Sequence, residues 1–154
     1  MEVSLSWGIA CLLDRLGDGH GRRVLIEATG VELSDVLLAT ELARKAWAVS
    51  VLVRDIGSVD SGLARTEEAG VVVDWVQAGA ETEGFLARRF AFVVCIGTPG
   101  VAEDRCEELG RVLQADGLLL LALGRGGRVP SLRGLEGVSL AKGENVTLVS
   151  ARRV

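Results

Sequence analysis

Short apolar runs alternate with amphipathic segments along most of this chain, and this alternation restricts its fold more than any other feature. Continuous apolar runs are typical of strands that are covered on both faces of a sheet. Segments with apolar residues at helical spacing stand between these runs. Regular alternation of strand and helix implies right-handed βαβ units and a doubly wound, mostly parallel α/β sheet. The predicted strands are 24–26, 49–53, 71–75, 92–96 and 118–123, and the predicted helical segments include 33–47, 63–69, 81–89 and 102–113.

The two ends of the chain follow patterns of their own. Apolar residues recur at helical spacing from Leu5 to Leu16, and the glycines that follow end this pattern. Near the other end, apolar segments at 138–140 and 146–149 are separated by a turn cluster too short for a helix, which predicts an antiparallel hairpin. We therefore expect a single domain over 1–154, with an N-terminal helix in 1–20, a βαβ core over 21–123 and a C-terminal hairpin in 134–154.

Composition excludes several partners and several kinds of chemistry. The 154 residues are 49% hydrophobic with a formal net charge of −4, so the chain can bury a core but has no basic field for nucleic acid. No apolar run approaches the roughly 20 residues that span a bilayer, and no segment resembles a secretion signal, so we expect a cytoplasmic protein with no membrane partner. The sequence has no Tyr and one His, which excludes a Tyr general acid and a multi-His metal site. We predict no metal.

The three cysteines, Cys11, Cys95 and Cys106, stand among apolar neighbours without C-x-x-C spacing. Such cysteines are usually buried thiols rather than ligands or nucleophiles. We predict that all three are buried and reduced.

Four segments of the chain resemble the class I S-adenosylmethionine-dependent methyltransferases. Gly21–Leu25 looks like the lead-in to that family's first strand, and Phe90–Gly97 resembles its fourth strand. Glu107–Leu121 is similar to the helix and leader before strand five, and Leu148–Arg153 is similar to the closing strand. The resemblance covers about residues 20–154. It implies a Rossmann-like, mostly parallel sheet that ends in an antiparallel β-hairpin.

The family's cofactor turn is poorly matched. In the family, an acidic residue ends the first strand and a G-x-G-x-G turn follows, where glycines let the backbone approach the cofactor. With the first strands aligned, Ile26 stands at the acidic position and Ala28 at the first glycine. Gly30 matches the second glycine, but Glu32 replaces the third. A carboxylate at Glu32 would repel the carboxylate of the cofactor's methionine moiety.

Further positions decide whether a cofactor can bind. Glu27 follows the acidic position by one residue, so it replaces the missing acid only if the strand shifts its register. Without that shift, we interpret Glu27 and Glu32 as solvated turn carboxylates. Asp55 stands near the family's acidic residue for the ribose hydroxyls. Gly79, however, stands where the family's Asp meets the adenine amine.

The segment after strand four is also atypical. Gly97 begins Gly-Thr-Pro-Gly, where amino-methylating members of the family carry N-P-P-[YF]. The resemblance thus implies Glu27, Gly30, Asp55 and Gly97 as cofactor-binding residues only if S-adenosylmethionine binds at all, and it identifies no catalytic residue.

A second family competes for the same segments. Ala28–Gly30 resembles the G-A-T-G turn of atypical short-chain dehydrogenases, and Leu52–Asp55 resembles their L-V-R-D strand end, where Arg54 would meet a 2′-phosphate. Glu27 and Leu33 replace glycines of that turn. Because the chain has no Tyr for the Tyr-x-x-x-Lys pair, this resemblance implies at most an NAD(P) sensor.

Three hypotheses therefore stay open. The chain is a methyltransferase-like domain that has lost its cofactor and acts as an interaction or structural module, with a plan similar to the amino-terminal domain of anamorsin-like iron–sulfur assembly proteins. Alternatively, it is a small active methyltransferase that uses Glu27, Gly30 and Asp55, or it is the NAD(P) sensor. We expect a protein partner or self-association, through residues 1–16 or through the hairpin edge near 146–149.

Overall fold

The computed structural model describes seven strands and two longer helices of this chain. The described residues are 10, 13–27, 33–54, 56–77, 89–97, 109–124, 135–142 and 146–153. The elements are, in chain order, β1 (Arg23–Glu27), α2 (Leu33–Arg44), β2 (Ala48–Val53), α3 (Ile56–Glu68), β3 (Asp74–Gln77), β4 (Phe90–Gly97), β5 (Leu113–Gly124), β6 (Leu135–Lys142) and β7 (Val146–Arg153).

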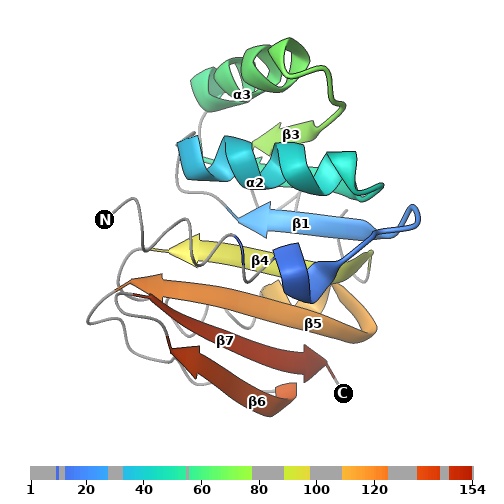
Figure 1. The fold of residues 1–154 in the computed structure, drawn as a ribbon, viewed down its shortest axis with the longest axis vertical. Helices are drawn as coiled ribbons and strands as arrows, with labels where there is room; N and C mark the ends of the chain where they lie inside the picture. The colour runs from blue at the N-terminus through green and yellow to red at the C-terminus, as the bar shows by residue number, and fades with distance from the viewer. Residues whose placement is uncertain are drawn as a thin grey trace.

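The described strands form one seven-stranded sheet in the order β3-β2-β1-β4-β5-β7-β6 (Figure 1). Neighbouring strands from β3 to β5 are parallel. β7 runs antiparallel to both β5 and β6, so the C-terminal strands form the predicted hairpin. The chain builds outward from β1 to β3 and then returns to the other side of β1 with β4. This order confirms the predicted doubly wound sheet with an antiparallel edge.

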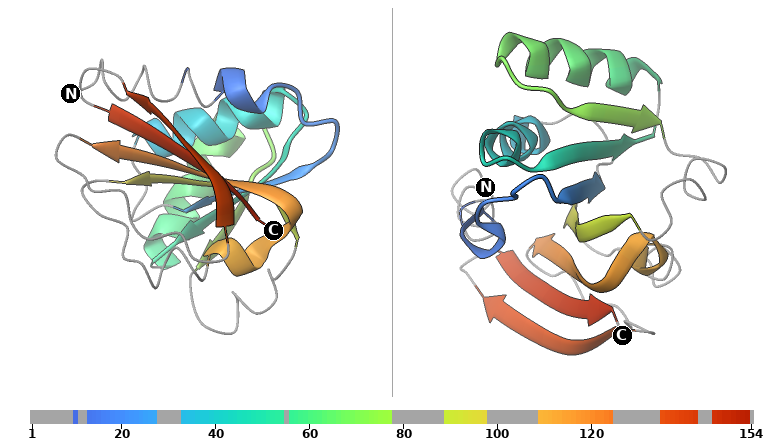
Figure 2. Two further views of the ribbon diagram at one scale, coloured as in Figure 1. Left: turned by 90° about the horizontal axis from the view of Figure 1, so that it is seen from below. Right: turned by 90° about the vertical axis from the view of Figure 1, so that its right-hand side faces the viewer.

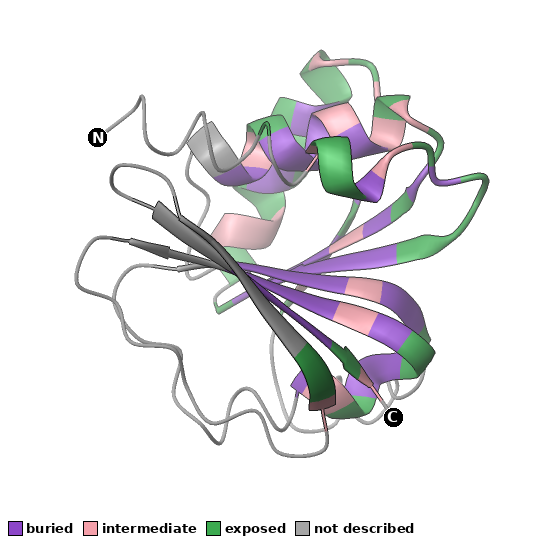
Figure 3. Cartoon of the chain, turned by 60° about the horizontal axis from the view of Figure 1, so that its bottom comes forward, coloured by how far each residue is buried: buried purple, intermediate pink, exposed green. Residues whose placement is uncertain are grey.

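Each face of the sheet has its own apolar core. On one face, α2, α3 and the helical residues 13–16 cover the sheet (Figure 2). Leu16, Leu38 and Leu42 belong to one apolar cluster with Val24 and Ile26 of β1. On the other face, the helical residues 109–112 pack in a second cluster with Leu25, Leu52, Val93 and Leu121. Figure 3 shows the central strands buried and the outer sides of the helices exposed. Burial on both faces explains why these strands are continuous apolar runs.

Trp47, which follows α2, contacts the segment before β1. Its indole Nε1 donates a hydrogen bond to the carbonyl of Gly17 across 2.8 Å. The guanidinium of Arg22 lies 4.7 Å from the centre of the Trp47 ring, and Phe92 meets that ring edge-on at 5.1 Å. A Cβ on Gly19 would come within 2.6 Å of the Trp47 backbone, so this close approach requires glycine.

Several predicted boundaries were wrong. α3 begins at Ile56 rather than at residue 63, and β3 begins at Asp74, later than the apolar residues 71–73 suggested. The amide of Val71 donates to the carbonyl of Thr66 at the end of α3, so this segment closes the helix before the strand starts. Leu113 was predicted in a helix but begins β5, because the helical turn ends at Val112.

Other predicted features lie outside the described residues. These are most of the N-terminal helix, residues 81–88 of the helical turn predicted at 81–89, and the first part of the helix predicted from residue 102. Arg89 itself is described and is not helical. In the part of the chain that is described, no helix has the length and apolar character needed to cross a membrane.

Candidate functional site

The carboxyl ends of β1 and β4 mark the point where the order of the sheet reverses. β1 pairs with β2 on one side and with β4 on the other. In open α/β sheets, ligands bind in the crevice outside the carboxyl ends of the strands at such a switch point. This edge of the sheet is therefore the candidate site, and the last residue of β1 lies at its centre.

That residue is Glu27, and its side chain is only 5% exposed. Its strand neighbours are Leu52 in β2 and Cys95 in β4, both of which belong to the second apolar core. Because side chains alternate along a strand, Glu27 shares its face of the sheet with Leu25. A carboxylate in such surroundings is unfavourable unless polar groups compensate for its lost hydration.

Arg54 supplies one of these polar groups. It follows the last residue of β2, and its Nη2 donates to Oε1 of Glu27 across 3.2 Å. The Arg54 side chain is 52% exposed, so the guanidinium reaches inward from the surface to a buried carboxylate. The pair joins the carboxyl ends of β1 and β2 directly beside the switch point.

The interpretation of Glu27 as a solvated turn carboxylate was wrong. β1 continues one residue beyond the apolar run, and Glu27 is buried in the strand instead of lying in a turn. The strand needs no shift of register for this, since Val24 and Ile26 still face α2. The burial is tolerated because Arg54, far away in the sequence, lies in reach of the carboxylate.

The other candidate cofactor residues are placed only in part. Gly97 is the last residue of β4 and pairs with Leu123 of β5, so it lies at the same edge of the sheet as Glu27. Gly30 and Asp55 lie outside the described residues, and so do Glu32 and Gly79. Within the described part of the chain, the structure therefore brings Glu27 and Gly97 to one edge.

Sequence reasoning missed a second buried acid near this edge. Asp35 lies in the first turn of α2, the helix that follows β1, and is 5% exposed. Acidic side chains are favourable at the positive end of a helix dipole. An acid two residues into a predicted helix is the signal that would have identified it.

The described residues also include side chains of the types that bind metal ions, Cys95 among them. Across the described ranges, no three side chains of His, Cys, Asp and Glu gather as metal ligands. Cys95 is buried and forms no disulfide, as predicted, whereas Cys11 and Cys106 lie outside the described residues.

Comparison with known proteins rests on structure. No protein-family model matches the chain, and no curated protein matches it in sequence. The tRNA (m1A58) methyltransferase TrmI from Aquifex aeolicus is similar with a TM-score of 0.75 and 11% identity, over 96% of this chain and 68% of that one. An RNA methyltransferase from Salinibacter ruber, solved with S-adenosyl-L-homocysteine, is similar with a TM-score of 0.71 and 14% identity, over 94% and 88%.

The chain has the fold of the class I S-adenosylmethionine-dependent methyltransferases. The strand order and the antiparallel β7 are those of this methyltransferase fold, so the structural expectation from the sequence resemblance is confirmed. The CurJ carbon methyltransferase has a TM-score of 0.69 and 10% identity over 92% of this chain, which spans about half, 51%, of the CurJ chain. At these identities the methyltransferase likeness establishes the fold alone.

Proposed function

We propose that this chain is a methyltransferase-like domain that does not bind S-adenosylmethionine and works as a non-catalytic interaction or structural module. The observation that carries the proposal is the Glu27–Arg54 ion pair at the switch point. It places a polar contact within the protein at the edge where the fold would receive a cofactor.

The chemistry of S-adenosylmethionine fits this pair poorly. An acidic residue that serves the cofactor must have carboxylate oxygens free to accept hydrogen bonds from ribose hydroxyls or from the ammonium group. Glu27 is almost fully buried, and Arg54 donates to one of its oxygens. A hydrogen bond to a charged group contributes about 1.5–3 kcal/mol, so a ligand that displaced Arg54 would lose roughly ten- to hundredfold in affinity.

The sequence around the site supports the same proposal. Ile26, Ala28 and Glu32 each depart from the acid and glycines of the family's cofactor turn, and Gly79 lacks the carboxylate expected for the adenine amine. Glu32 and Gly79 affect the methionine and adenine ends of the cofactor, whereas Asp55 still stands near the family's acid for the ribose hydroxyls. The proposed module would instead bind a protein partner or a second copy of itself.

One observation favours a second candidate, a small active methyltransferase with an unusual pocket. Glu27 is a buried carboxylate on the last residue of β1, close to where the family places its acid. In that case Arg54 would have to move away when the cofactor binds, and Gly30, Asp55 and Gly97 would complete the site. The two candidate functions differ in whether S-adenosylmethionine or S-adenosylhomocysteine binds and stabilises the folded protein.

Thermal-shift measurements with S-adenosylhomocysteine, S-adenosylmethionine and NADPH separate these functions, because a ligand that binds the folded state raises the melting temperature. The proposal expects no shift with any of the three. A rise with S-adenosylhomocysteine that Glu27→Gln abolishes would establish the methyltransferase alternative. A rise with NADPH that Arg54→Gln abolishes would establish a nucleotide sensor. Arg44→Gln, at an exposed pair on α2, is the control for loss of a charge.

A further inference from the structure

A pocket of about 320 Å³ opens at the opposite edge of the sheet from the Glu27–Arg54 pair. The first residues of four parallel strands line it, namely Arg23 of β1, Ala48 of β2, Asp74 of β3 and Phe90 of β4. Four residue steps separate Arg23 from Glu27, which is about 13 Å along the strand. The pocket is therefore a separate place from the switch point where the fold would receive a cofactor.

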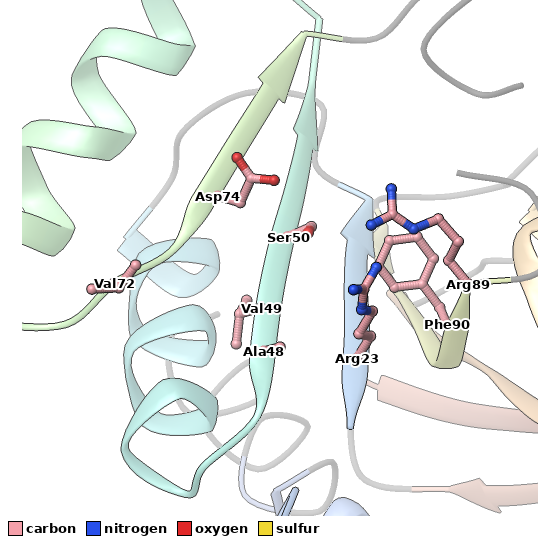
Figure 4. Close-up of a pocket in the computed structure, with 8 residues that line it drawn as sticks. All are labelled: Arg23, Ala48, Val49, Ser50, Val72, Asp74, Arg89 and Phe90. Carbon is pink, nitrogen blue, oxygen red and sulfur yellow. The ribbon is translucent and has the colours of Figure 1, made fainter. Parts of the chain in front are cut away.

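The pocket has a positive side formed by Arg23 and Arg89. Arg89 directly precedes β4, and the two guanidinium groups lie beside the Phe90 ring on the β1–β4 side (Figure 4). Among the described residues, neither arginine forms an ion pair, in contrast to Arg44 and Arg54. Guanidinium groups that lie close to one another repel, and an anion between them would relieve that repulsion.

The opposite side of the pocket carries oxygen atoms that can accept hydrogen bonds. Asp74 and Ser50 are directly paired residues on β3 and β2, and both line the pocket. Val49 and Val51 face α2, so Ser50 between them faces the other side of the sheet. Asp74, as the strand partner of Ser50, faces that same side. No described cation pairs with the Asp74 carboxylate. The pocket is thus polarised, with cations on one side and an acceptor on the other.

An apolar ring and the size of the pocket restrict the ligand further. Phe90, which is 2% exposed, lines the pocket beside the two arginines (Figure 4). The volume lies at the lower end of the roughly 300–1,000 Å³ that is usual for small-molecule sites. A ligand with several negative charges would meet repulsion from Asp74.

We propose that this amino-edge pocket binds a small molecule with a carboxylate or phosphate head, held by Arg23 and Arg89, and an ammonium or hydroxyl group that donates to Asp74. Guanidinium groups bind both kinds of head through charge-assisted hydrogen bonds. The proposal is independent of the function proposed for the switch point, because it uses other residues at the other end of the strands.

Calorimetric titration of the full chain with O-phosphoethanolamine, β-alanine and inorganic phosphate tests the proposal. We expect saturable binding of at least one of the two zwitterions, and comparison of them distinguishes a phosphate head from a carboxylate head. Arg23→Gln and Arg89→Gln should each weaken this binding about tenfold or more, because each removes a charge-assisted contact. Arg65→Gln, which removes an exposed arginine of α3, should leave it unchanged.

Asp74→Asn tests the orientation of the ligand. It should weaken binding of the zwitterion and leave inorganic phosphate unchanged or tighter, since the substitution removes a negative charge. Melting curves verify that each variant is folded. The proposal would be overturned by the absence of saturable binding for both zwitterions, by equal weakening in Arg65→Gln, or by an Asp74→Asn variant that binds the zwitterion as tightly as the unmodified chain.

Discussion

The guanidinium of Arg54 lies 3.2 Å from the carboxylate of Glu27, so one ion pair connects the carboxyl ends of β1 and β2. The carboxylate is buried and the guanidinium is half exposed. Solvent around Arg54 weakens the attraction compared with a fully buried pair, but removal of Arg54 still leaves a buried carboxylate without one of its partners.

A double-mutant cycle with Glu27→Gln and Arg54→Gln should therefore reveal coupling between the two residues. We expect a coupling energy of about 0.5–2 kcal/mol in chemical denaturation, with Arg54→Gln the more harmful single change. The matched control is the exposed Glu41–Arg44 pair on α2, at 3.0 Å, where coupling should not exceed about 0.5 kcal/mol. Equal coupling in both pairs would show that the burial of Glu27 has no energetic importance.

Gly62 in α3 packs directly against the ring of Trp75. A Cβ at this position would lie 2.3 Å from a ring atom, closer than any real contact. Alanine normally stabilises a helix interior by about 1 kcal/mol relative to glycine, but overpacking costs about 1–3 kcal/mol. Gly62→Ala should therefore lower the free energy of unfolding, whereas Ser61→Ala at the exposed neighbouring position should not. A higher melting temperature for Gly62→Ala would contradict this packing.

Thr66 joins the same helix to β3 through its hydroxyl group. Trp75 Nε1 donates to Thr66 Oγ1 across 3.2 Å, and Thr66 Oγ1 donates to the carbonyl of Gly62 across 3.0 Å. Thr66→Val keeps the shape but leaves a buried indole N–H without its acceptor, which should cost about 1–3 kcal/mol in denaturant unfolding. Thr66→Ser keeps the hydroxyl and should lose less. The explanation fails if the valine variant is as stable as the serine variant.

Arg153 near the end of β7 holds the helical turn before β5. Its Nη1 donates to the carbonyls of Gly110 and Arg111, each at 3.0 Å, and to that of Leu113. The last carbonyls of a helical turn lack partners within the helix, so these bonds satisfy them. Arg153→Ala should lower the free energy of unfolding by about 1–2 kcal/mol. Arg152→Ala, at the exposed neighbouring position, should change it much less, and an equal loss in the two variants would count against this role.

The sequence predicted structure best where the structure depends on residues that are close together in the chain. The apolar runs at 24–26 and 92–96 lie within β1 and β4, and the turn cluster after Lys142 separates the two strands of the hairpin. Boundaries were less predictable. The first turns of α3 contain Gly57, Ser58 and Asp60, which weaken the helical pattern, although Val59 in these turns still packs against the apolar core.

The candidate site was harder to predict because its partners are far apart in the sequence. Nothing next to Glu27 indicates that a strand end can bury it, since the compensating cation comes from the end of β2. Arg23 and Arg89 likewise become neighbours only when β1 and β4 pair. Local patterns predict strands and helices well, whereas charge pairs across strands depend on the completed sheet.

Isothermal titration calorimetry of the unmodified chain with S-adenosylhomocysteine and S-adenosylmethionine determines whether the switch point binds this cofactor. The Glu27–Arg54 pair predicts no saturable heat with either compound. Micromolar binding of either compound at one site per chain would contradict the proposed loss of cofactor binding and establish the switch point as a working cofactor site.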